Sequence, residues 1–118
     1  MSLDTPVIWH NPRCTKSRQT LALMEQKGIS PRIRLYLEDA PSEAEIREVV
    51  ERLGLDSARD LMRVKEAEYK QLGLDKEKSE DKLVAAMAQT PKLIERPVVL
   101  KGERAVIARP PEDVLDIL

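Results

Sequence analysis

The chain has 118 residues, of which 42% are hydrophobic and 35% are charged, and its 20 Lys and Arg nearly balance its 21 Asp and Glu. The balanced charge and the lack of a polybasic run argue against nucleic acid and against a membrane surface as partners. Phe is absent and there are one Trp and two Tyr, so no aromatic platform for stacking bases is expected. The length predicts one domain, over residues 1–118, with a core of aliphatic side chains.

Targeting signals and cysteine usage limit the compartment. Residues 1–5 have neither a basic segment nor a long apolar run, which predicts no signal peptide and no transmembrane segment. Cys14 is the single cysteine, so an internal disulfide and a cysteine-based metal cluster are excluded. A lone thiol fits a reducing compartment. We therefore expect a cytoplasmic monomer without a bound cofactor or metal.

The first third of the chain predicts a strand, a helix and a second strand. Residues 6–9 form a short apolar run that is typical of a buried strand. The pattern over residues 15–27 predicts a helix, and Gly28 is placed to close it in the left-handed conformation. Residues 32–37 alternate polar and apolar side chains, which predicts a second strand.

The middle of the chain predicts helices. Ser42 and Glu45 form the signature of a capping box, and Gly54 ends the helix that follows. Apolar side chains recur on one face of that helix, at Ile46, Val49, Val50 and Leu53. Three more helices are expected: one near residues 57–62, one near residues 66–72, and one capped by Ser79.

The last part of the chain predicts a hairpin and a final helix. Residues 97–100 and 104–108 are strands around a tight turn, and residues 112–118 form the helix. The early strand–helix–strand unit implies a parallel pair with a right-handed crossover. Together these elements predict a thioredoxin-like α/β fold, with a four-stranded mixed sheet flanked by helices and a helical insertion between its two halves.

The first strand–helix junction is the candidate site. Asn11-Pro12 is a turn signal, so Cys14 falls at the start of the first helix. Free backbone N–H groups and the positive end of the helix dipole lower the pKa of a thiol at that place. Basic side chains lie close by in the sequence: His10, Arg13, Lys16 and Arg18. Cys14 is thus a candidate nucleophile or anion-binding group, and the alternative is a small buried hydrophobic side chain.

Four segments of the chain resemble the glutaredoxin-linked arsenate reductase (ArsC) family. They are His10-Asn11-Pro12-x-Cys14-x-x-Ser17-Arg18, Leu72-Gly73-Leu74, Arg96-Pro97-Val98-Val99, and Arg109-Pro110 followed by Val114-Leu115-Asp116-Ile117-Leu118. The resemblance covers essentially the whole chain in order. It implies a thioredoxin-like fold with a helical insertion, and a cis peptide bond before Pro97. It also identifies the chain as a short-form member, because the dedicated arsenic-resistance enzymes continue beyond the position of Leu118.

The resemblance also implies roles for individual residues. Cys14 corresponds to the nucleophile and His10 to the histidine that keeps the thiol acidic. Three arginines correspond to those that bind the oxyanion: Arg63, Arg96 and Arg109. Ser17 lies one turn after the cysteine, where its hydroxyl could donate to the sulfur or to the anion. One departure is Thr15-Lys16, where the dedicated enzymes often have Gly-Thr.

The residues suit the reduction of arsenate to arsenite. A thiolate and an oxyanion repel each other, so the site needs positive charge already in place, and arginine supplies it with paired donors. In this hypothesis Cys14 attacks arsenic and displaces water, glutathione adds next as co-substrate, and electron transfer yields arsenite. Glutaredoxin then reduces the remaining mixed disulfide. The lack of a second cysteine requires such external thiols.

The sequence also bears on two other interpretations. Phosphatase-like arsenate reductases have an arginine six residues after the cysteine, and here that position is Thr20, which excludes them. The alternative function is a thiol protein that does not act on arsenate, or a redox or transcription regulator that binds a partner such as RNA polymerase. Such regulators usually have Cys-x-x-Cys, whereas Ser17 takes the second position here.

Overall fold

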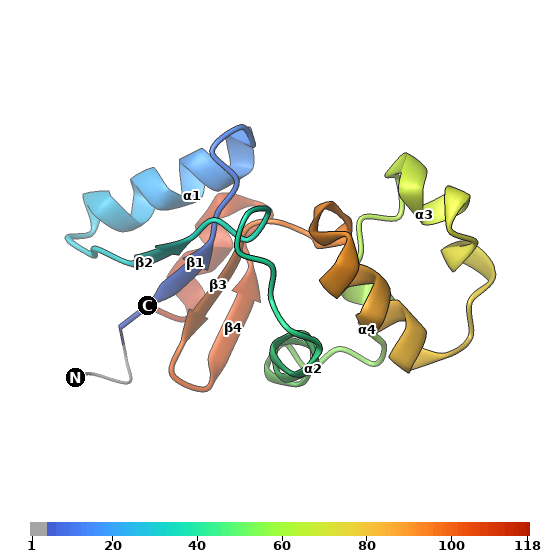
Figure 1. Ribbon diagram of the computed structural model, residues 1–118. Helices are drawn as coiled ribbons and strands as arrows, with labels where there is room; N and C mark the ends of the chain where they lie inside the picture. Colours follow the sequence, from blue (N-terminus) through green and yellow to red (C-terminus); the bar gives the residue numbers. More distant parts are fainter. Residues whose placement is uncertain (1–4) are drawn as a thin grey trace. The chain divides into compact units, whose positions relative to one another are not determined.

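A computed structural model describes residues 5–118 (Figure 1). The chain divides into two compact units. One, the sheet unit, contains residues 5–39 and Arg96–Leu118, and the other, the helical unit, contains Ala40–Glu95. The helical unit is therefore the insertion that the sequence predicts. A single domain over residues 1–118 stays a prediction, because an insertion within one domain also produces two such units.

The sheet unit contains the predicted four-stranded mixed sheet. Its strands are β1 (Val7–Trp9), β2 (Arg32–Arg34), β3 (Val98–Lys101) and β4 (Arg104–Ile107). They lie in the order β2-β1-β3-β4. β1 runs parallel to β2 and antiparallel to β3, and β3 and β4 form the hairpin. The thioredoxin-like arrangement expected from the sequence is confirmed.

The ends of the strands meet at one edge of the sheet. Trp9, the last residue of β1, pairs with Val98, the first residue of β3, and Val98 also pairs with Ile107, the last residue of β4. Because β2 is parallel to β1, the segment after Arg34 leaves the sheet on the same side as the segment after Trp9. The segments that follow β1, β2 and β4 therefore lie at this edge, together with the segment that precedes β3.

The core of the sheet unit lies between the sheet and two helices. Helix α1 (Thr15–Gln26) joins β1 to β2 and ends before Gly28, whose φ is 76°. The 3-10 helix η4 (Pro111–Asp116) packs beside α1. The buried cluster draws on all of these elements: Ile8, Met24, Val99, Ala108, Val114 and Ile117. In Figure 1, α1 is drawn above β2, at the top of the sheet. The expected final helix is thus a six-residue 3-10 helix, longer than most helices of this kind.

The second strand is shorter than the sequence predicts. β2 stops at Arg34, and a turn replaces the expected strand over residues 35–37. The carbonyl of Leu35 accepts hydrogen bonds from the N–H groups of Glu38 (3.0 Å) and Asp39 (2.9 Å). Arg34 closes the turn with an ion pair to Asp39 at 3.3 Å. The turn leaves the side chains of Leu35 and Leu37 exposed, at 38% and 44%.

The helical unit consists of short helices joined by side-chain hydrogen bonds. They are α2 (Glu43–Arg52), η1 (Ala58–Leu61), α3 (Ala67–Gln71), η2 (Leu74–Lys76), α4 (Glu80–Gln89) and η3 (Pro91–Leu93). Arg59 donates to the carbonyl of Leu74 at 2.7 Å and also contacts the Tyr69 hydroxyl and the Glu77 carbonyl. One half-buried guanidinium thus links α3, η2 and the residue that follows η2.

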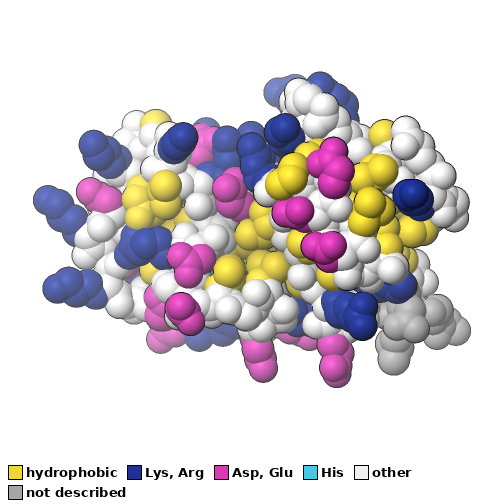
Figure 2. All heavy atoms as spheres, turned by 180° about the vertical axis from the view of Figure 1, so that it is seen from behind, with side chains coloured by type: hydrophobic (Ala, Val, Ile, Leu, Met, Phe, Trp, Pro, Cys, Tyr) yellow, Lys and Arg dark blue, Asp and Glu magenta, His cyan; other side chains and the backbone are white. Residues whose placement is uncertain are grey.

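Charges of both signs occur together on the surface. Figure 2 shows Lys and Arg side chains among Asp and Glu on the face in view, with hydrophobic side chains between them. On the helical unit, Arg47 lies 2.9 Å from Asp81 and 3.9 Å from Glu43. No helix in residues 5–118 combines the length and the apolar character that crossing a membrane requires.

The predicted capping box is present at the start of α2. The Ser42 hydroxyl oxygen accepts from the Glu45 N–H at 3.1 Å, and the Ser42 N–H donates to the Glu45 carboxylate at 3.0 Å. Two backbone N–H groups without partners inside the helix are satisfied in this way. The helix start is therefore specified by these two side chains.

Replacing the capping serine should destabilise the protein measurably. We expect Ser42→Ala to lower the free energy of unfolding by about 1 kcal/mol, because the Glu45 N–H loses its acceptor. Urea denaturation followed by circular dichroism measures the change. Ser30→Ala removes an exposed hydroxyl outside any helix and serves as the control. An equal effect in the two variants would contradict the capping role.

Candidate active site

The loop after β1 positions Cys14 at the first turn of α1. The Asn11 carbonyl accepts from the Cys14 N–H at 2.9 Å, and the Asn11 side-chain oxygen accepts from the Arg13 N–H at 3.0 Å. Cys14 is the N-cap residue of α1, with an extended backbone, and its side chain is half-buried. The predicted strand–turn–helix junction is confirmed, and Asn11 is the residue that shapes it.

The surroundings of Cys14 favour its thiolate. Burial raises the pKa of the thiol, but three groups outweigh it and the net pKa is lower than usual. The Ser17 N–H lowers the pKa most, the Arg96 guanidinium lowers it through hydrogen bonding and its positive charge, and the Lys16 N–H has a smaller effect. A helix start and one cation together thus stabilise the negative sulfur, as expected at such a position.

His10 and Ser17 form a buried pair behind the thiol. The imidazole Nδ1 lies 2.6 Å from the Ser17 hydroxyl oxygen, which also accepts from the Asn11 N–H at 3.1 Å. Burial lowers the pKa of His10, and the charge of Arg18 lowers it further, so both effects favour the neutral ring. The hydroxyl hydrogen can then bond to a neutral Nδ1. His10 contacts the site through Ser17, and its predicted part in keeping the thiol acidic stays a prediction.

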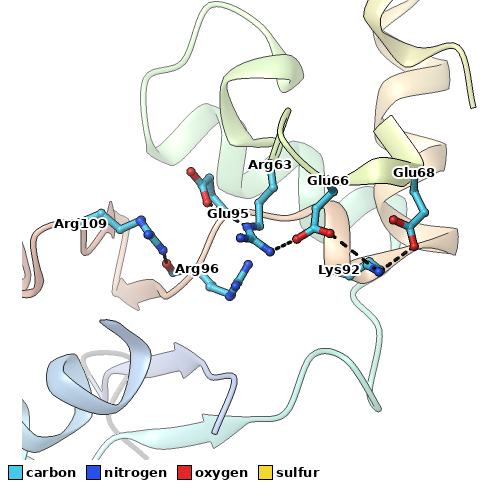
Figure 3. Close-up of polar contacts among 7 residues, drawn as sticks. All are labelled: Arg63, Glu66, Glu68, Lys92, Glu95, Arg96 and Arg109. Carbon is cyan, nitrogen blue, oxygen red and sulfur yellow. Dashed lines mark hydrogen bonds and ion pairs between the residues drawn. The ribbon is translucent and has the colours of Figure 1, made fainter. Parts of the chain in front are cut away.

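Two of the predicted arginines lie together in the sheet unit. The Arg109 guanidinium donates to the Arg96 carbonyl at 2.9 Å (Figure 3). The peptide bond between Arg96 and Pro97 is cis, as predicted, and so is the bond between Arg109 and Pro110. Within residues 5–118, the buried Nε of Arg96 has no acceptor. A charged donor without a partner is a suitable group for an oxyanion.

The third predicted arginine has carboxylate partners. Arg63 belongs to the helical unit, whereas the other predicted site residues belong to the sheet unit. Its guanidinium contacts the Glu66 carboxylate, and its Nε lies 3.6 Å from Glu95 (Figure 3). Lys92 extends the cluster, at 3.8 Å from Glu66 and 2.7 Å from Glu68. The charge of Arg63 is largely neutralised there, and its role as an oxyanion ligand stays a prediction.

A pocket of about 340 Å³ lies beside the cysteine loop and was not predicted. Residues 10–13 form one wall, and Leu35, Leu37 and Glu38 form the other. The alternating side chains of residues 32–37 predict a strand through Leu37. Such a strand would leave no turn there, so the sequence pattern did not predict the pocket. Within residues 5–118, no group of three His, Cys, Asp or Glu side chains is placed to hold a metal ion.

The chain matches a family model and several known proteins over nearly its full length. The model described as ArsC family matches residues 9–117. An uncharacterized protein from Escherichia coli, YfgD, is 50% identical over 112 residues, which cover 94% of each chain. An arsenate reductase from Haemophilus influenzae is 49% identical over 113 residues, covering 95% of this chain and 97% of that one.

A solved structure is similar to this chain in both sequence and fold. The arsenate reductase from Vibrio cholerae superimposes with a TM-score of 0.94 at 51% identity, covering 97% of this chain and 98% of the other.

The acidity of Cys14 should depend on Arg96. We expect the thiol pKa to lie below that of free cysteine and to rise in Arg96→Ala, because the variant removes a hydrogen bond and a positive charge from the thiolate. The pH dependence of alkylation by iodoacetamide measures both values. Arg104→Ala, which removes an exposed arginine of β4, is the control. An unchanged thiol pKa in Arg96→Ala would contradict the contact.

His10 should resist protonation. We expect its pKa to lie below the usual histidine value and to rise in Arg18→Ala, because removing a nearby positive charge favours the imidazolium. Titration of the imidazole followed by NMR measures the shift. The rise should be partial, since burial of the ring is the larger cause and persists in the variant. A pKa equal to that of free histidine in the parent protein would contradict the assigned environment.

Proposed function

We propose that this chain, which belongs to the ArsC family, reduces arsenate to arsenite through Cys14, with glutathione and glutaredoxin as external reductants. The observation that carries the proposal is the half-buried thiol whose pKa is lowered by the start of α1 and by Arg96. Similarity to arsenate reductases at about half identity supports it. A lone thiol needs a reducing compartment, and we therefore place the protein in the cytoplasm, acting as a monomer.

Electrostatics explains why arginines surround such a thiol. Two unit charges about 4 Å apart interact by roughly 4 kcal/mol near a protein surface, and arsenate near pH 7 is largely doubly charged. Approach of the anion to a thiolate is therefore costly unless cations offset the repulsion. The unpartnered Nε of Arg96 and the exposed guanidinium of Arg109 are the groups in the sheet unit that suit this role. Arg63 is proposed as a third ligand on the resemblance alone.

The first chemical step forms a covalent adduct. The Cys14 sulfur attacks arsenic, an As–S bond forms, and an As–O bond breaks with the oxygen leaving as water after protonation. Arsenic stays in its pentavalent state in this step. The Ser17 N–H is well placed to hold the sulfur during attack, because the His10 and Asn11 contacts to the Ser17 hydroxyl fix this turn of the helix.

The second step is the reduction. Glutathione thiolate attacks the Cys14 sulfur, an S–S bond forms, and the As–S bond breaks with its electron pair passing to arsenic. Arsenic becomes trivalent and leaves as arsenite, while the two sulfurs are oxidised to a mixed disulfide. Glutaredoxin then attacks the glutathione sulfur and releases the Cys14 thiolate. The chain has no second cysteine to do this internally.

An assay coupled to NADPH tests the proposal. With glutathione, glutathione reductase and glutaredoxin present, we expect arsenate-dependent NADPH oxidation that Cys14→Ser abolishes, because serine supplies no thiolate. Arg96→Lys should lower kcat/KM for arsenate about a hundredfold, since one ammonium does not replace a guanidinium donor pair. Arg104→Ala should behave like the parent protein. No arsenate-dependent turnover in the parent would overturn the function and favour a thiol protein that acts by binding a partner.

A further inference from the structure

The pocket beside the cysteine loop has a composition that the anion site does not explain. We name it the side pocket, formed by residues 10–13 together with Leu35, Leu37 and Glu38. Both walls belong to the sheet unit, and both follow parallel strands at the same edge of the sheet. Arg13 is the residue directly before Cys14, so the pocket adjoins the reactive residue along the chain.

The side pocket carries one charge of each sign and an apolar surface. Arg13 and Glu38 are exposed, and neither side chain has a hydrogen-bond or ion-pair partner among residues 5–118. Leu35 and Leu37 expose 38% and 44% of their surface beside them. A small oxyanion would be repelled by the carboxylate of Glu38 and would gain nothing from the leucines. The set of groups suits a flexible zwitterion with carboxylate, ammonium and apolar parts.

We propose that the side pocket binds glutathione, with Arg13 paired to one of its carboxylates and Glu38 to its ammonium group. The inference rests on the proposed function, which requires a peptide thiol to reach Cys14. A chain of three residues spans at most about 10 Å, and adjacent Cα atoms are about 3.8 Å apart. Glutathione anchored on Arg13 is therefore long enough for its sulfur to reach the cysteine. The arsenate-binding arginines are separate groups, so anion and thiol can be present together.

Binding of an unreactive analogue tests the pocket without any arsenate chemistry. S-methylglutathione has the charged ends of glutathione but no free thiol. NMR titration of the parent protein should shift the amides of residues 10–13 and 35–38. We expect Arg13→Ala and Glu38→Ala each to weaken binding about three- to tenfold, as for loss of one exposed charge-assisted bond. Arg32→Ala and Glu25→Ala remove exposed charges outside the pocket and should leave the affinity unchanged.

Kinetics gives a second readout. Arg13→Ala and Glu38→Ala should raise KM for glutathione by the same factor as the loss of affinity, with KM for arsenate and the thiol pKa of Cys14 unchanged. With 2-mercaptoethanol as the reductant both variants should match the parent, because this thiol has no charged ends to bind. A raised KM for arsenate would assign the pocket to the anion and overturn the inference.

The outcomes separate this inference from the function on which it rests. Binding of S-methylglutathione at residues 10–13 in a protein without arsenate-dependent turnover would overturn the proposed function and support the pocket. Arsenate reduction with an unchanged KM for glutathione in both variants would overturn the pocket alone. Loss of turnover only when glutaredoxin is the electron donor, without binding of S-methylglutathione, would show that the surface docks a protein and would also overturn the pocket.

Discussion

The effect of Arg96 on the pKa of the Cys14 thiol depends on the antiparallel pairing of β1 and β3. That pairing places the end of one strand and the start of the other at a single edge of the sheet, with Trp9 opposite Val98. Cys14 follows the first strand and Arg96 precedes the second, so residues far apart in sequence become neighbours. β4 pairs with β3 and brings Arg109 to the same edge. The order of the strands therefore brings the cysteine and both arginines to one edge of the sheet.

The start of α1 supplies backbone N–H groups that help to stabilise the Cys14 thiolate. A guanidinium alone would have to overcome the cost of burying a thiolate, which raises its pKa. Backbone N–H groups of the first turn also offset the cost of burying the thiolate, and they do so without a further charged side chain. Their direction is fixed by the Asn11 turn and by the Ser17 hydroxyl, which is held between His10 and the Asn11 N–H. A neutral His10 suits this role, since its ring orients the turn without adding a positive charge next to that of Arg18.

Sequence patterns predict the fold well where a signal is local. The apolar run before Trp9, the Asn11-Pro12 turn and the Ser42 capping box each depend on neighbouring residues, and each is present. The side pocket could not be predicted, because hydrogen bonds to the Leu35 carbonyl end a strand whose alternation continues to Leu37. The ion pair of Arg63 with Glu95 could not be predicted either, because the two residues are far apart in the sequence and only the fold brings them together.

Because the chain has a single cysteine, the site must also accommodate a second thiol from solution. One thiol can form an adduct with an oxidant but cannot complete a two-electron reduction, so a second sulfur must enter from solution. The site then needs two recognition surfaces of different character at one edge of the sheet. Cations alone suit the oxyanion, and Arg96 and Arg109 have that character. A peptide thiol carries both charges and an apolar stem, and the Arg13, Glu38 and leucine surface has the matching mixture. Under this proposal the early end of β2 matters, because a strand continued through Leu37 would leave no turn for the second surface.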